Sequence, residues 1–339
     1  MSSSSHARVS VFFDGFSALQ ILRAAQAANV PLGKSRLRRA PTRAPSLREV
    51  AVAIDEVESL FPGLRLRRPA HILLAGAARC RPSELCRSSA CSLELSEGSF
   101  LCVCAGVYVA SPELCYLREA ACGASEPALL ELGFELCGRY QTQRTGALPS
   151  YQARPLTCVR KLRAYTEMNA SANGARKAAH AARWLANNSA SPRETQLAIV
   201  LGLPCSQGGA GLGAPRMNYK VEASRKAQLI AHRSFFLCDL CWPEAKVDVE
   251  YQSREMHQGE TARVSDSQRT KALKSMEWDV TEVTNVDFDS STSMEAIVDT
   301  LRRSLGKDSR IRVRDYHNRT LDLRVQLGLP LDSWRAWDE

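Results

Sequence analysis

The stretch that decides the fold is FFLCDLCWPEAKVDVEYQ, residues 235–252. Its first part, Phe235 to Trp242, is apolar apart from one aspartate, and its second part, Lys246 to Tyr251, alternates polar and apolar residues. Short runs of this kind, joined by Pro243-Glu244, are typical of two β-strands in a hairpin. We therefore predict two adjacent antiparallel strands here.

Acidic residues lie on both predicted strands. Asp239 interrupts the first, and on the second Asp248, Glu250 and Gln252 share one face because they alternate with apolar residues. If the apolar faces of both strands join one core layer, Asp239 and Glu250 project together on the opposite face. Two carboxylates so close repel each other unless a cation neutralises them, and Mg²⁺ (or Mn²⁺) suits such oxygen ligands.

A third acid, Glu194, lies close to the start of a helix that Ser191-Pro192 is predicted to open, and it can reach the same place. Simpler interpretations exist for all three acids. Asp239 and Glu250 fit the solvated side of an antiparallel sheet, and Glu194 fits a first-turn acid that the helix dipole favours. The residue pattern alone leaves both interpretations open.

The order of the remaining elements predicts an α/β fold for the second half. After the helix through Leu201 we expect a Gly-rich loop, three strands, a helix and a last strand, followed by an α-region. These lie at 207–215, 218–221, 235–242, 246–251, 265–276, 278–284 and 293–305. Helices and strands in this order predict a mixed sheet flanked by helices.

The first half predicts a mixed helical and short-strand domain. Helices are expected at 16–25, 46–60, 111–122, 126–136, 158–168 and 175–186, and strands at 70–75, 99–104 and 107–110. Ser46 and Glu49 form a predicted capping box. A chain of 339 residues accommodates two domains. We expect a first domain at 1–150, a basic helical connector at 151–190, a second domain at 191–310 and an extension at 311–339.

Composition excludes a membrane span, because no run approaches eighteen apolar residues. The start of the sequence lacks the features of a secretory signal, so we expect a cytoplasmic protein. Its twelve cysteines then fit small buried hydrophobes. Cys238 and Cys241 are three apart on a predicted strand and should face opposite sides, which favours packing roles over a shared zinc ion.

The net charge of +9 is concentrated in two blocks. Residues 139–190 carry nine Lys or Arg against one acid, and Lys34 to Arg48 hold no acid. Phosphate backbones attract such blocks, so DNA is a candidate partner, although a solvated basic surface explains the charge equally well. The candidate nucleic-acid-binding residues are Arg36, Arg38, Arg39, Arg160, Lys161, Arg163, Arg176 and Lys177.

The acids of the second half carry a family resemblance. Glu194 on a helix, Asp239 on a strand and EYQ on the next strand resemble the active-site pattern of PD-(D/E)XK nucleases. The longer stretch DLCWPEAKVDVEY, with His257, DSQR and WDV after it, is similar to a bacterial domain of unknown function related to very-short-patch-repair endonucleases. The resemblance covers residues 191–288 and implies a restriction-endonuclease-like fold.

That resemblance implies a Mg²⁺-dependent endonuclease acting on DNA. Glu194, Asp239 and Glu250 would hold the ion, and Gln252 or His257 would position the attacking water. The chain departs from the family at Gln252, where a carboxylate or lysine is usual, and a glutamine cannot act as a base at neutral pH. For His257, an ordinary loop histidine is the alternative.

The first half resembles, over shorter motifs, abortive-infection type IV antitoxin-like proteins. The matching motifs are FSAL at 16–19 and VYVASPE at 107–113. This similarity implies a DNA-associated regulatory region in front of the nuclease-like domain. It also implies the alternative function, a catalytically inactive DNA-binding regulator with a vestigial nuclease fold.

Overall fold

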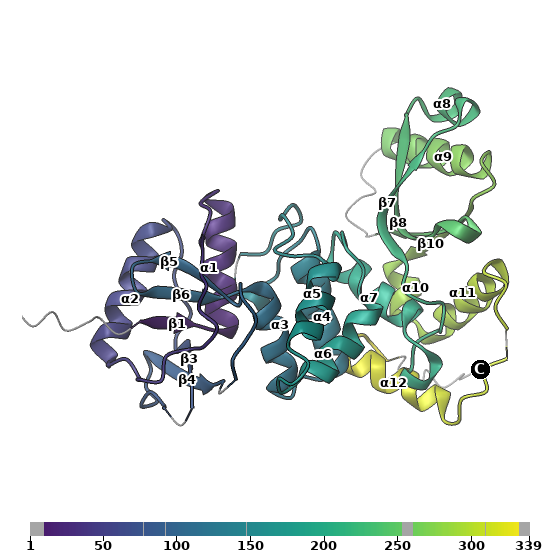
Figure 1. Ribbon diagram of the computed structural model, residues 1–339. Helices are drawn as coiled ribbons and strands as arrows, with labels where there is room; N and C mark the ends of the chain where they lie inside the picture. The colour runs from purple at the N-terminus through teal and green to yellow at the C-terminus, as the bar shows by residue number, and fades with distance from the viewer. Residues whose placement is uncertain are drawn as a thin grey trace, which may run out of the picture. The chain divides into compact units, whose positions relative to one another are not determined.

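The structure, a computed structural model, describes residues 10–76, 78–91, 93–146, 148–252, 260–308 and 310–331, with the backbone alone at 144 and 260–266. The chain divides into two compact units (Figure 1). Unit 1 comprises residues 1–124 and 135–182, and unit 2 comprises residues 125–134 and 183–339. Each unit has helices and its own mixed sheet, which confirms the predicted α/β fold class.

Unit 1 is built on a six-stranded sheet in the order β2-β5-β6-β1-β3-β4. The strands are β1 (Val11–Phe13), β2 (Gly33–Lys34), β3 (Ala70–Leu74), β4 (Cys86–Ala90), β5 (Phe100–Cys104) and β6 (Val107–Ala110). β1 pairs parallel with β6 and antiparallel with β3. Phe13 and Ile72 are register partners in the centre of the sheet and are fully buried. The strands expected near 70, 99 and 107 are confirmed, whereas β1, β2 and β4 were not expected.

The helices of unit 1 begin in different ways: a serine side chain caps two of them, at Ser46 and Ser111, and others start without a side-chain cap. They are α1 (Gly15–Ala27), α2 (Leu47–Leu60), α3 (Pro112–Ala121), α5 (Val159–Met168) and α6 (Ala175–Ala181), and α4 (Glu126–Cys137) crosses the boundary between the units. The capping box of Ser46 and Glu49 is confirmed. α5 and α6 pack against α3. Most of the expected connector at 151–190 is therefore part of unit 1, and the division falls after Ala182.

Unit 2 contains a four-stranded sheet in the order β10-β9-β8-β7. Its strands are β7 (Arg216–Glu222), β8 (Phe235–Trp242), β9 (Val247–Gln252) and β10 (Asp279–Thr284). β8 pairs antiparallel with β7 and β9, and β10 pairs parallel with β9. The predicted hairpin is thus confirmed. Its turn is a short 3₁₀ helix, Pro243–Ala245.

The helices of unit 2 are α7 (Pro192–Gly202), α8 (Arg225–Ala231), α9 (Glu260–Lys274), α10 (Asn285–Asp289), α11 (Ser291–Ser304) and α12 (Tyr316–Gln326). α8 and α9 lie side by side against the sheet (Figure 1). Phe236 of β8, Ala227 of α8 and Leu273 of α9 share this core. α12 packs against the 3₁₀ turn Cys205–Gln207, so the helix in the expected C-terminal extension belongs to unit 2.

Among the helices of the described residues, none combines the length and the apolar character that crossing a membrane requires.

Candidate functional site

The ladder between β7 and β8 is interrupted where Asn218 and Asp239 oppose each other. Register pairs continue on both sides of this position, but Asn218 itself has a φ of 45°. This left-handed conformation is one that asparagine tolerates better than most residues. Cys238 and Cys241, which lie on either side of Asp239 in β8, belong to the same core cluster. Both cysteines are fully buried in this cluster, in agreement with the packing roles expected for them.

The carboxylate of Asp239 turns toward β9. Its Oδ2 atom accepts a hydrogen bond from the backbone N–H of Tyr251 at 3.0 Å. Burial, followed by the nearby carboxyls of Glu250 and Glu194, raises the pKa of Asp239 well above its usual value. The three acids predicted from the sequence therefore influence one another electrostatically in the folded protein.

Glu194 lies in the first turn of α7 and is almost fully buried. Its backbone N–H donates to the hydroxyl of Ser191, which caps the helix. The Glu194 carboxylate accepts three hydrogen bonds, each of 3.0 Å, from the N–H of Ala190, the hydroxyl of Ser191 and the side-chain amide of Asn218. Burial raises the pKa of Glu194, and these hydrogen bonds oppose the shift. Glu194 is thus tied to the strand residue that opposes Asp239.

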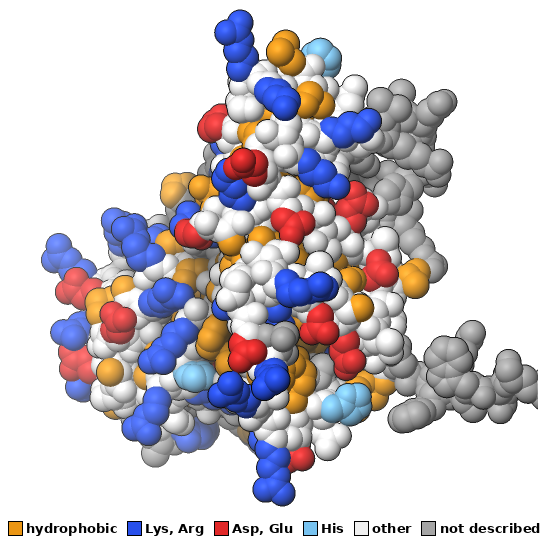
Figure 2. Space-filling model, turned by 90° about the vertical axis from the view of Figure 1, so that its right-hand side faces the viewer, with side chains coloured by type: hydrophobic (Ala, Val, Ile, Leu, Met, Phe, Trp, Pro, Cys, Tyr) orange, Lys and Arg blue, Asp and Glu red, His pale blue; other side chains and the backbone are white. Residues whose placement is uncertain are grey.

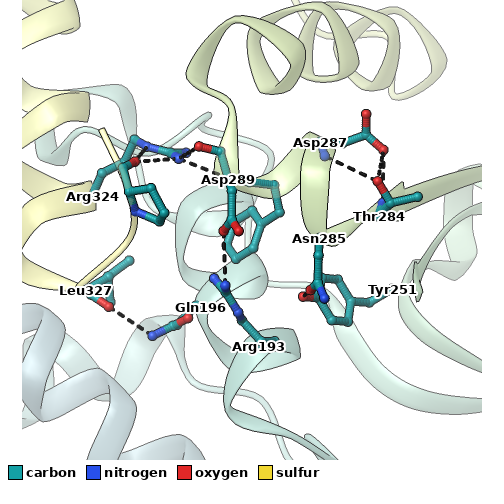
Figure 3. Close-up of polar contacts among 11 residues, drawn as sticks. Arg193, Gln196, Tyr251, Thr284, Asn285, Asp287, Asp289, Arg324 and Leu327 are labelled. Atoms are coloured by element: carbon teal, nitrogen blue, oxygen red, sulfur yellow. Dashed lines mark hydrogen bonds and ion pairs between the residues drawn. The ribbon is translucent and has the colours of Figure 1, made fainter. Parts of the chain in front are cut away.

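The first turn of α7 is also anchored on α10 (Figure 3). Arg193 forms an ion pair of 3.0 Å with Asp289, and its guanidinium lies over the ring of Phe288 at 5.6 Å from the centroid. The buried guanidinium of Arg324 donates to the carbonyls of Phe288, Asp289 and Pro330. These contacts tie the first turn of α7, which carries Glu194, to the end of α10.

The end of β9 carries the remaining predicted residues. The Tyr251 hydroxyl donates to the side-chain oxygen of Asn285, as Figure 3 shows. Gln252 is the last residue of β9, is partly buried, and lies in register with Thr284 of β10. His257, the other candidate for positioning water, lies outside the described residues.

Glu250 lies on the side of the sheet that α9 covers. The guanidinium of Arg269 on α9 forms an ion pair with its carboxylate and also donates to the carbonyl of Leu237. We expected Asp239 and Glu250 to project together on the side of the sheet away from the core. Glu250 instead lies on the side that α9 covers. Glu250 raises the pKa of Asp239, but its carboxylate pairs with Arg269 of α9, whereas the Asp239 carboxylate binds the backbone of β9.

Two further residues, Cys238 and Asp248, complete this acidic region. One ligand atom of each lies within 4.8 Å of the other and of a Glu250 carboxylate oxygen. Asp248 is fully buried, and neither of its carboxylate oxygens meets a hydrogen-bond donor among the residues that the structure describes. The shared face of residues 248 and 250 was visible in the sequence. The involvement of Cys238 was not, because it depends on a contact between two strands that the sequence pattern did not indicate.

The donor chemistry of Asp239 and Glu250 fits a hard divalent cation, since both offer carboxylate oxygens. Glu194 fits less completely. Three donors already occupy its carboxylate. Among the described residues, neither Glu194 nor Asp239 belongs to the ligand group around Glu250 whose atoms all lie within 4.8 Å of one another. Asp239 and Glu250 are therefore the residues best suited to hold Mg²⁺, with Glu194 beside them.

A pocket of about 450 Å³ adjoins the start of β8. His232, Arg233 and Arg269 are among its lining residues. Arginine side chains bind phosphate groups through charge-assisted hydrogen bonds. Arg269 of α9 and Arg233, which precedes β8, thus place positive charge next to the acidic region.

All eight predicted nucleic-acid-binding residues lie in unit 1. Arg38 and Arg39 pair with Glu94, and Arg163 and Lys177 donate to backbone carbonyls. The other four predicted residues are exposed, and the structure describes no ion pair or hydrogen bond of their side chains: Arg36, Arg160, Lys161 and Arg176. On the face shown in Figure 2, Lys and Arg side chains lie among Asp and Glu side chains.

Comparison with known proteins gives no family for this chain: no family model matches it, and no curated protein or solved structure is significantly similar.

Proposed function

We propose that the protein is a DNA-directed, divalent-metal-dependent endonuclease-like protein that hydrolyses phosphodiester bonds. Glu194, Asp239 and Glu250 would hold Mg²⁺ or Mn²⁺. The observation that carries this proposal is the position of the Asp239 carboxylate, which binds the N–H of Tyr251 and lies close enough to Glu250 and Glu194 for their charges to act on it. Carboxylates gathered in this way are stabilised by a bound cation.

The cation, when bound, would polarise a phosphate and lower the pKa of a coordinated water. The protein's own residues would then fix the geometry. The hydrogen bond from Tyr251 orients Asp239, and the contacts of Arg193 orient the helix that carries Glu194. Gln252 would orient a water without taking its proton, and His257 is the remaining candidate for a base.

DNA is the proposed partner, and basic residues of both units support it. Arg233 and Arg269 border the pocket next to the acidic region, where a phosphate group would be attracted. The exposed residues Arg36, Arg160, Lys161 and Arg176 of unit 1 would contact the DNA backbone. We further propose the bacterial relationships implied by the resemblance: a nuclease-like second half behind an antitoxin-like first half, in a cytoplasmic protein.

The test is the nicking of supercoiled plasmid by the purified protein in Mg²⁺ or Mn²⁺. Asp239→Asn should abolish nicking, because it removes a charged ligand with little change in shape. Asp279→Asn, which changes an exposed acid of the neighbouring strand β10, is the matched control and should nick as the wild type does. Equal nicking by wild type and Asp239→Asn would contradict the proposal.

A second candidate function is a catalytically inactive DNA-binding regulator with a vestigial nuclease fold. Two observations favour it: Gln252 provides no charge at the end of β9, and the carboxylate of Glu194 is already bound by three protein donors. This candidate predicts salt-dependent DNA binding without nicking.

A further inference from the structure

We propose that Cys238, Asp248 and Glu250 form a second metal site, which takes a zinc-class divalent cation. The three side chains come from adjacent strands, β8 and β9, and one ligand atom of each lies within 4.8 Å of the other two. The site differs from the proposed magnesium site in two of its three ligands and shares Glu250 with it. It does not depend on the protein being a nuclease.

Asp248 is the side chain that points to a ligand. It is fully buried, its carboxylate lies beside Cys238 and Glu250, and neither oxygen meets a donor among the described residues. Buried polar groups are nearly always satisfied, and an unpaired buried carboxylate is strongly unfavourable. A cation held between the three side chains would satisfy both oxygens of Asp248.

Charge balance favours a divalent ion. A thiolate and two carboxylates carry three negative charges, and Arg269 supplies one positive charge through its ion pair with Glu250. A divalent cation would supply the other two, so the buried group would be neutral. A monovalent ion would leave an uncompensated negative charge.

Ligand chemistry selects the kind of metal. Sulfur from Cys238 is a soft ligand, which Mg²⁺ and Ca²⁺ avoid and Zn²⁺ accepts together with carboxylate oxygen. Three protein ligands also leave one position of a tetrahedral zinc site for water or another ligand. We therefore assign Zn²⁺, with Co²⁺ as its spectroscopic substitute.

The experiment is a titration of the full-length, metal-free protein with Co²⁺ in the presence of a non-thiol reductant. Thiolate coordination gives a sulfur-to-cobalt charge-transfer band in the near ultraviolet. Wild type should show this band at a ratio of one cobalt per chain, and Zn²⁺ should remove it. Cys241→Ser, which alters a second buried cysteine of β8, should keep the band. Cys238→Ser should lose it, and Asp248→Asn should bind cobalt at least tenfold more weakly.

Circular dichroism of each variant would show that it is folded. Absence of the band in folded wild type would overturn the proposal, and so would its persistence in Cys238→Ser, because the sulfur would then come from another cysteine. A second measurement is the thermal midpoint. Zn²⁺ should raise it in wild type but not in folded Asp248→Asn, and equal shifts would also overturn the proposal. Neither readout involves DNA cleavage, so failure here is distinguishable from failure of the nuclease proposal.

Discussion

Arg269 of α9 forms an ion pair with Glu250 of β9, and the same guanidinium donates to the carbonyl of Leu237 on β8. One side chain thus ties the helix to both strands of the hairpin that carries the acids. Because the side chains of Arg269 and Glu250 are only 24% and 14% exposed, water cannot replace either partner well. The ion pair therefore stabilises the fold and also positions one candidate metal ligand.

Replacing Arg269 should destabilise the protein. Arg269→Met leaves the Glu250 carboxyl in a mostly buried place without its cation, which should cost about 3 kcal/mol of unfolding free energy. Arg39→Met removes the exposed pair with Glu94 and should cost less than about 1 kcal/mol. Urea denaturation measures both. Similar losses in the two variants would refute the structural role assigned to Arg269.

Arg324 should also be important for stability. Its buried guanidinium donates to the carbonyls of Phe288, Asp289 and Pro330, so Arg324→Met should cost about 3 kcal/mol. Arg319→Met, on the same helix but exposed, should cost less than about 1 kcal/mol. A thermal midpoint for Arg324→Met as high as that of Arg319→Met would show that the carbonyl contacts contribute little.

Stability in the absence of metal should fall as the pH rises. Burial raises the pKa of Asp248, and burial followed by the neighbouring Asp248 raises the pKa of Glu250 to about 10. In the unfolded chain these groups lose their protons at about pH 4, so above this value the folded state binds more protons and loses stability with increasing pH. Asp248→Asn should flatten the decline between about pH 5 and 8.

The measurement for this prediction is the urea midpoint at several pH values in the presence of a chelator. Glu282→Gln, which changes an exposed acid on β10, controls for the loss of one charge. If wild type and Asp248→Asn decline with the same slope, the buried pair does not hold the proton that its geometry indicates.

DNA binding should depend on the exposed basic residues of unit 1. The double variant Arg160→Ala, Arg176→Ala removes two exposed charges and should lower the slope of log affinity against log salt by about 2. Arg81→Ala, an exposed arginine outside both basic blocks, should leave that slope unchanged. Fluorescence anisotropy with a labelled duplex gives both slopes, and an unchanged slope in the double variant would exclude these residues as phosphate contacts.

Local signals made the elements predictable. The capping box of Ser46 and Glu49 and the cap at Ser191 each involve residues within one helical turn, so the sequence contains all of their partners. The hairpin was predictable for a similar reason, because Phe235 to Gln252 contains both strands and the turn between them. Strands β1, β2 and β4 were missed, since short strands acquire their identity from neighbours that are distant in the chain.

The site was only partly predictable. The sequence indicated Glu194, Asp239 and Glu250, and burial followed by the Glu250 and Glu194 carboxyls raises the pKa of Asp239. The sequence did not indicate that Glu250 pairs with Arg269. This contact forms only when α9 packs against β9, and no local sequence pattern predicts that packing. The division between the units also differs from the expected first domain at 1–150. Residues 125–134 belong to unit 2, whereas the residues on either side belong to unit 1, and contacts between distant parts of the chain decide this division.

The most direct test of the central claim is whether Asp239 helps to bind a divalent cation. Electron paramagnetic resonance of free Mn²⁺ measures this without DNA, since protein-bound Mn²⁺ loses its sharp six-line signal. Wild type should deplete the free signal, and so should Cys238→Ser, whereas Asp239→Asn should deplete it far less. If wild type leaves the free Mn²⁺ signal as strong as it is in buffer alone, the proposed cation site on β8 and β9 does not exist.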